Sequence, residues 1–208
     1  QLATHLGSNG LPWARRVCFL TRVSGNFSSA GEWVRVWLSG SDWYLGGASS
    51  TSGVGAQARC MIVLTYSAEY FAHSASTNVR VLNEGSRWGC FVTGVGGDLT
   101  GYVRTIYSVG SWRLIAHAGS SSAGLWGRVR CARPLDGDAN AVEGEEYLWN
   151  DGDPPLFLEP DSRACVITLV GGPFDTPNGY MSILNVFGTW VLSSNQPAES
   201  HQGATCFS

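Results

Sequence analysis

Carboxylates are concentrated in residues 132–164, a stretch that holds nine of the 16 acidic residues of the chain. Within it, Asp136, Asp138 and Asn140 follow the DxDxN opening of a calcium-binding loop, whose oxygen ligands suit a hard divalent cation. Ala141 stands where an EF-hand requires Gly, and Tyr147 stands where it requires Glu. Two interpretations follow: a calcium site outside the EF-hand class, or a solvated acidic loop. Calcium is the one cofactor that the sequence suggests.

No catalytic motif accompanies these carboxylates. The sequence lacks the GxSxG, HExxH and P-loop patterns. Glycoside hydrolysis would need two carboxylates held on either side of a bond, and nothing in the sequence orients two of them. The four histidines form no recognisable constellation: His5, His73, His117 and His201. We therefore predict a protein without enzymatic activity.

Aromatic and arginine side chains offer a different chemistry, the recognition of a ligand. Aromatic rings can stack on sugar rings, while Arg, Ser and Asn can hydrogen-bond hydroxyl groups, and protein-binding surfaces use similar residues. The alternative is ordinary decoration of solvent-facing strands. The residues that we predict to lie on outward hairpin faces and in neighbouring Ser- and Gly-rich loops are Trp33, Arg35, Trp37, Tyr44, Tyr102, Arg104, Arg113, His117 and Trp126.

A ten-residue sequence motif, here called the repeated phrase, occurs three times and indicates a repeated scaffold that positions these side chains. It reads CFLTRVSGNF at Cys18–Phe27, CFVTGVGGDL at Cys90–Leu99 and CVITLVGGPF at Cys165–Phe174. Cys, Thr, Val and the second Gly are identical in all three copies. A motif that recurs at a regular period is typical of a protein built from repeated structural units, so we expect three such units. The phrase itself is predicted to form the first strand and turn of each unit.

The units are expected to span approximately residues 15–86, 87–160 and 161–208, with residues 1–14 completing the third. We assign them to a single all-β domain covering residues 1–208. Each unit should contain an opening strand, a hairpin and a closing strand, because apolar and polar residues alternate there between turn signals. One tryptophan recurs in each hairpin and is predicted to lie in the core: Trp43, Trp112 and Trp190.

Six cysteines bracket the units, one near the start and one at the end of each. The spacing within a unit is 42, 41 and 41 residues, which favours the disulfides Cys18–Cys60, Cys90–Cys131 and Cys165–Cys206. The rival set that also respects threefold repetition is Cys60–Cys90, Cys131–Cys165 and Cys206–Cys18. Either set persists only in an oxidising compartment, so we expect a secreted, extracellular protein.

Composition narrows the classes of partner. Charged residues make up 14% of the chain and the net charge is −3, which leaves no basic surface for a nucleic acid. No run of about 18 apolar residues occurs, so no transmembrane segment is predicted. The chain begins with Gln1, as a chain does after removal of a secretory signal. The expected partner is a glycan or a cell-surface receptor, and self-association is the other expectation.

Three β-rich units, each with an opening Cys, a hairpin and a closing Cys, resemble β-prism proteins of the vitelline membrane outer layer protein I type. The resemblance is one of architecture, and no residue is carried over from that family. It implies a pseudo-threefold β-prism with lectin-like binding of carbohydrate. A β-trefoil is the alternative fold. The expected function is non-enzymatic recognition of carbohydrate or a cell surface, and the alternative is a structural subunit of an extracellular fibre, coat or appendage.

Overall fold

The computed structural model is all-β, and none of the residues that it describes lies in a helix. The prediction of an all-β chain is thus confirmed. The described residues are 2–11, 14–50, 53–75, 78–82, 88–119, 124–134, 147–150, 154–158, 164–172, 174, 176, 178–195 and 200–207.

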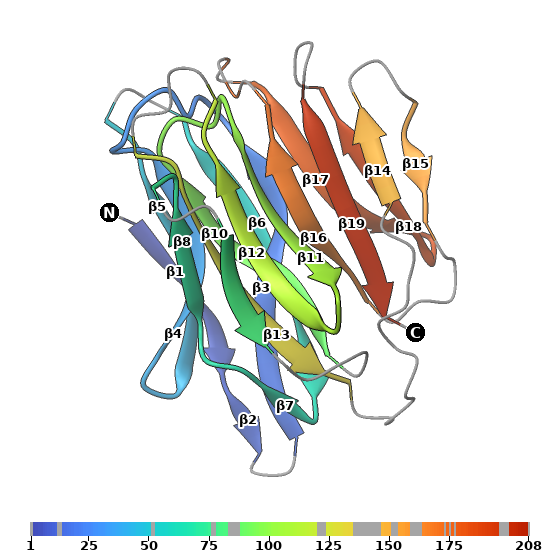
Figure 1. The fold of residues 1–208 in the computed structure, drawn as a ribbon. Helices are drawn as coiled ribbons and strands as arrows, with labels where there is room; N and C mark the ends of the chain where they lie inside the picture. Colours follow the sequence, from blue (N-terminus) through green and yellow to red (C-terminus); the bar gives the residue numbers. More distant parts are fainter. Residues whose placement is uncertain are drawn as a thin grey trace.

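The strands form three antiparallel sheets (Figure 1). Sheet A has the order β1 (Leu2–Ser8), β5 (Asp42–Ala48), β4 (Trp33–Ser39), β10 (Gly89–Gly96), β13 (Trp126–Arg133) and β7 (Thr65–Tyr66), with β8 (Tyr70–His73) also on β13. Sheet B has the order β15 (Leu156–Phe157), β18 (Thr189–Ser194), β17 (Tyr180–Val186), β3 (Ala14–Ser24) and β2 (Gly10–Leu11), with β6 (Gly55–Val63) also on β3. Sheet C has the order β14 (Tyr147–Asn150), β19 (His201–Phe207), β16 (Ala164–Gly171), β11 (Tyr102–Ser108), β12 (Ser111–His117) and β9 (Asn78–Leu82).

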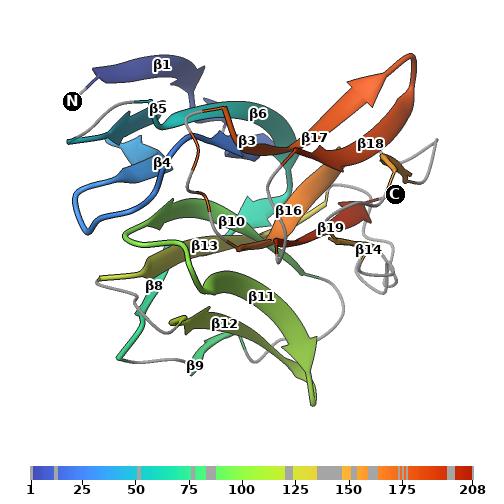
Figure 2. The ribbon, with the colours of Figure 1, turned by 90° about the horizontal axis from the view of Figure 1, so that it is seen from above.

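Each sheet joins the hairpin of one repeat to the opening and closing strands of another. Hairpin β4–β5 of the first repeat pairs with β10 of the second, and hairpin β11–β12 of the second pairs with β16 of the third. Hairpin β17–β18 of the third repeat pairs back onto β3 of the first. Seen from above, the three hairpins point in three different directions (Figure 2). No repeat therefore completes a sheet without a neighbour.

The three predicted disulfides are present, each joining directly opposed residues of an opening and a closing strand. The pairs are Cys18–Cys60, Cys90–Cys131 and Cys165–Cys206, and the rival pairing is wrong. In the chain-entropy model, closing a loop of this length stabilises the folded chain by about 4 kcal/mol. No described cysteine is free.

The invariant Thr and Gly of the repeated phrase have distinct structural roles. Thr21, Thr93 and Thr168 are buried, and each lies where its opening strand bulges against the closing strand. The Gly at the end of each opening strand has a positive φ, which only glycine adopts without strain. These residues are Gly25, Gly97 and Gly172, with φ of 107°, 88° and 105°.

The turns after the three opening strands are linked around the molecule. The amide of Gly97 donates to the Glu32 carbonyl of the first repeat, and the amide of Gly172 donates to the Gly101 carbonyl of the second. The amide of Gly25 closes the cycle through the carbonyl of Gly179. Just beyond these turns lie three fully buried apolar side chains that end the repeated phrases: Phe27, Leu99 and Phe174.

The core contains the three tryptophans that the repeat predicted. Trp43, Trp112 and Trp190 are 0%, 4% and 3% exposed. A buried indole N–H needs an acceptor. Trp43 donates to the Arg16 carbonyl over 2.9 Å, and Trp112 donates to the Trp88 carbonyl over 2.8 Å. Both acceptors stand two residues before an opening Cys, so the bond ties each hairpin to its own opening strand.

Candidate functional site

The nine predicted ligand-binding residues lie on the outer faces of two sheets, turned away from the core. In β4 the intervening Val34 and Val36 are buried, which leaves their neighbours facing outward. Five of the nine share the outer face of sheet A: Trp33, Arg35, Trp37, Tyr44 and Trp126. The other four share the outer face of sheet C: Tyr102, Arg104, Arg113 and His117.

Two glycines of β10 bring the side chains of sheet A together. Gly96 lies between Trp33 on β4 and Trp126 on β13 in the strand register. A Cβ at Gly96 would come within 2.6 Å of the Trp126 ring and of the Trp33 Cβ. Gly94 lies in the same way between Arg35 on β4 and Arg128 on β13. The bare backbone of β10 is therefore the floor between two rows of large side chains.

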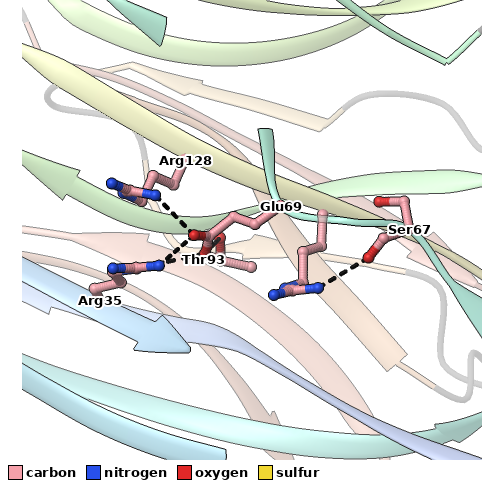
Figure 3. A network of polar contacts seen from close by, with 6 residues as sticks. Arg35, Ser67, Glu69, Thr93 and Arg128 are labelled. Carbon is pink, nitrogen blue, oxygen red and sulfur yellow. Dashed lines mark hydrogen bonds and ion pairs between the residues drawn. The ribbon is translucent and has the colours of Figure 1, made fainter. Parts of the chain in front are cut away.

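Glu69, just before β8, organises the arginines on this face. Its side chain is 8% exposed, and it accepts hydrogen bonds from Nε and a terminal nitrogen of Arg35. Nη1 of Arg128 donates to the same carboxylate over 2.8 Å, and the hydroxyl of Thr93 donates over 3.2 Å. Figure 3 shows both guanidinium groups directed at Glu69. Charge-assisted bonds of this kind hold the two guanidinium groups in place.

Aromatic rings flank these guanidinium groups. The guanidinium of Arg128 lies 4.8 Å from the Phe71 ring centroid and 5.6 Å from that of Trp126, and Arg35 lies 6.0 Å from that of Trp37. Such contacts favour a cation over a ring face. We call the whole surface the aromatic–arginine face. Its members are Trp33, Arg35, Trp37, Tyr44, Glu69, Phe71, Trp126 and Arg128.

A row of rings extends this face toward the edge of sheet A. Trp37 stacks on Tyr44 with ring centroids 5.8 Å apart and planes inclined by 24°. His5 of β1 follows with its ring 5.6 Å from Tyr44. On the other side of Trp37, the ring of Trp33 lies 6.4 Å away. The row thus places partly exposed aromatic residues across β4, β5 and β1.

A buried cation lies in the same sheet beyond this face. Arg130 is 9% exposed, and its guanidinium lies 5.3 Å from the ring of Trp43 and 5.7 Å from that of Tyr66. Burial lowers the pKa of Arg130, and the nearby charge of Glu69 partly offsets that effect. Nη1 of Arg130 donates to the carbonyl of Ser67 over 2.9 Å. This arginine supports the connector that follows β6 and carries Glu69.

The predicted residues of sheet C are arranged differently. The rings of Tyr102 and His117 lie 5.1 Å apart, and Arg113 donates to the side chain of Asn78 over 3.2 Å. Leu169 lies opposite Arg104 in the register, where sheet A has Gly94 opposite Arg35. The bare glycine floor of sheet A is thus interrupted here.

Sequence reasoning missed Glu69, Phe71 and Arg128, which complete the aromatic–arginine face. Glu69 and Phe71 come from the connector that follows β6, and no local pattern specifies the pairing of this connector with β13 of the second repeat. Arg128 could have been predicted from the sequence, because it stands between Gly127 and Val129, which are buried, in the alternating pattern of a strand. That alternation places it on the same face as Trp126.

The predicted calcium ligands Asp136, Asp138 and Asn140 lie outside the described residues. Within the described part of the chain, no group of three or more His, Cys, Asp or Glu side chains could hold a metal ion. Among the same residues, no helix is long and apolar enough to cross a membrane.

Comparison with protein-family models, curated proteins and solved structures finds no match to this chain. Any functional conclusion therefore depends on the geometry of the chain itself. The three disulfides agree with an oxidising, extracellular environment.

Proposed function

We propose that this chain is a secreted, non-enzymatic recognition module that binds carbohydrate, on a cell surface or free, through the aromatic–arginine face. One observation carries the proposal: partly exposed indole rings lie beside two guanidinium groups that Glu69 already holds in position. A sugar presents an apolar ring face and a rim of hydroxyl groups, and this surface offers partners for both.

The guanidinium groups keep the capacity to bind a ligand. Each carries more N–H donors than Glu69 occupies, and the side chains of Arg35 and Arg128 remain 28% and 29% exposed. Because the carboxylate fixes their orientation, less side-chain entropy is lost when a ligand binds. The face is therefore preorganised for hydroxyl or carboxylate groups of a saccharide.

We further propose that the fold is a pseudo-threefold prism of the β-prism type. The support is cyclic: each hairpin pairs with an opening strand of a different repeat, and each turn glycine bonds to a different repeat in the same sense. The core then serves all three sheets, so their outer faces can diverge without loss of the fold.

A glycan array probed with the wild-type chain tests the proposed function. Substituting residues by their counterparts from other repeats provides variants that the fold accommodates, namely Trp37→Ile, after Ile106, and Arg35→Ser, after Ser182. We expect one class of saccharide to bind the wild type and each variant to bind at least tenfold more weakly. Tyr102→Ala on sheet C is the matched control and should retain binding.

The alternative, a structural subunit of an extracellular fibre, coat or appendage, has its own support. Two hairpin tips present exposed apolar residues, Val109 at 94% and Phe187 at 104% exposure. Val186, next to Phe187, is also 45% exposed, and exposed apolar surface at neighbouring residues commonly marks contacts between proteins. A negative array together with rings or filaments in electron micrographs would favour this alternative over glycan recognition.

A further inference from the structure

The closing strands of the three repeats are equivalent in position but differ in what lies beside them. Each pairs with its own opening strand: β6 with β3, β13 with β10, and β19 with β16. On the other edge, β13 is covered by β7 and β8, and β19 is covered by β14. Within the described residues, no strand pairs with the other edge of β6.

The two covering strands share a register and a sequence pattern. Tyr70 of β8 lies opposite Val129, and Tyr147 of β14 lies opposite Ala204. Both tyrosines follow a Glu and precede an apolar residue, in EYFAH at 69–73 and EYLWN at 146–150. Val129 and Ala204 stand two residues before a closing Cys, as Ala58 does in β6. The outer edges of β6, β13 and β19 are thus three equivalent positions for a covering strand, and we call each a slot. Two slots are filled by strands that contain a tyrosine, β8 on β13 and β14 on β19.

Burial shows the effect of the missing cover. Cys131 and Cys206 are 0% and 3% exposed, whereas the equivalent Cys60 is exposed. Ile62, which lies on the same face of β6, is 46% exposed. The closing cysteines of the other two repeats are thus buried beside a covering strand, whereas Cys60 and the nearby Ile62 remain exposed. The β6 edge therefore leaves apolar surface in contact with water.

The backbone of β6 is also prepared for a partner. At the covered edge of β13, Ser67 donates its N–H to the Cys131 carbonyl over 2.8 Å, and its hydroxyl accepts from the Cys131 N–H over 3.0 Å. Cys60 faces Cys18 with Cα atoms 4.0 Å apart, the narrow pair of an antiparallel ladder. In such a pair the N–H and C=O groups point away from the partner strand. Those of Cys60 and Ala58 consequently point into the open slot.

A pocket of about 460 Å³ lies beside the first half of β6, between this strand and β5. Its lining is mostly small or apolar and includes Val34, Leu45, Gly47, Val54 and Ala56. Strand β8 packs against both β12 and β13 of the second repeat, which are the equivalents of β5 and β6 (Figure 2). The pocket thus lies where an equivalent covering strand would place its second half.

We propose that the β6 edge binds an extended segment of a partner polypeptide, which adds to sheet B as an antiparallel strand. The segment carries tyrosine opposite Ala58, an apolar residue opposite Gln57, and a residue opposite Ala56 whose side chain enters the pocket. Main-chain hydrogen bonds supply affinity in this mode of recognition, and alternate side chains supply specificity. The two filled slots define the pattern: acidic, Tyr, apolar, any residue, then His or Asn. This proposal is independent of glycan binding on sheet A.

The chain's own covering sequence provides the probe. We would titrate the full chain with the synthetic peptide SAEYFAHS, which is the sequence of residues 67–74, and follow binding by calorimetry and amide hydrogen exchange. We expect saturable binding that slows exchange of the Ala58 and Cys60 amides. A peptide with Ala in place of Tyr should bind at least tenfold more weakly, because it loses the ring that packs on the core.

Ala58→Pro removes an N–H that faces the slot, at an edge position where proline is tolerated. We expect this variant to keep the far-UV spectrum of the wild type and to lose peptide binding at least tenfold. If the variant does not fold, the exchange data on the wild type decide the matter. Absence of binding by the wild type, or binding that slows exchange in β13 and leaves β6 unprotected, would overturn the proposal. Dimerisation through β6 that excludes the peptide would overturn it in favour of a second copy as the occupant.

Discussion

The outer faces of sheets A and C have the same backbone plan and different side chains. Trp37 on sheet A corresponds to Ile106 on sheet C, and Gly94 corresponds to Leu169. Sheet A adds Glu69, a carboxylate 8% exposed that bonds to two arginines. We infer that the repeat maintains the core and the strand register, while the outward positions are free to specialise. We therefore expect ligand binding on sheet A, and we expect core substitutions in sheets A and C to lower stability equally.

Removing a core tryptophan should lower the free energy of unfolding more than any other change considered, and by an equal amount in sheets A and C. We expect Trp43→Ala and Trp112→Ala each to lower the free energy of unfolding by about 3–5 kcal/mol, because each leaves a large cavity and a carbonyl without its indole donor. Denaturant titration of the two variants would measure this. A large loss in one sheet and a small loss in the other would show that the repeats do not share one core.

Changing Glu69 should affect sheet A alone. We expect Glu69→Ala to lower the free energy of unfolding by about 2 kcal/mol, because Arg35 and Arg128 lose their common partner while solvent screens part of the cost. Glu69→Gln is the matched control and should lose less, since it keeps an acceptor of the same size. Denaturation at low and high salt measures both, and a change below about 0.3 kcal/mol for Glu69→Ala would contradict a structural role for this carboxylate.

A methyl group on the floor of sheet A should have a smaller effect. Gly96→Ala would force apart the side chains of Trp33 and Trp126, at an expected cost of about 1–2 kcal/mol. Ser24 occupies the equivalent place in sheet B, opposite Tyr180, so Ser24→Ala is a control that should be nearly neutral. Thermal unfolding compares the two variants. Equal stability of both would mean that the glycine floor is not required to seat the aromatic residues.

Repetition explains which features could be predicted from the sequence. The disulfides and the core tryptophans recur at near-constant spacing, so three copies of one pattern support each assignment. The pairing of hairpins with opening strands of other repeats joins distant segments, and no local pattern specifies it. For the same reason Glu69 was missed: it reaches Arg35 and Arg128 only after its connector covers β13.

The indole N–H signals of the nine tryptophans, followed by NMR during titration with the saccharide class that the array selects, test the central claim most directly. We predict saturable shifts for Trp33, Trp37 and Trp126 on the aromatic–arginine face, with Trp43, Trp112 and Trp190 of the core unchanged. Repeating the titration with Glu69→Gln should weaken binding without moving the core signals. Saturable binding that leaves the signals of Trp33, Trp37 and Trp126 unshifted would contradict the account.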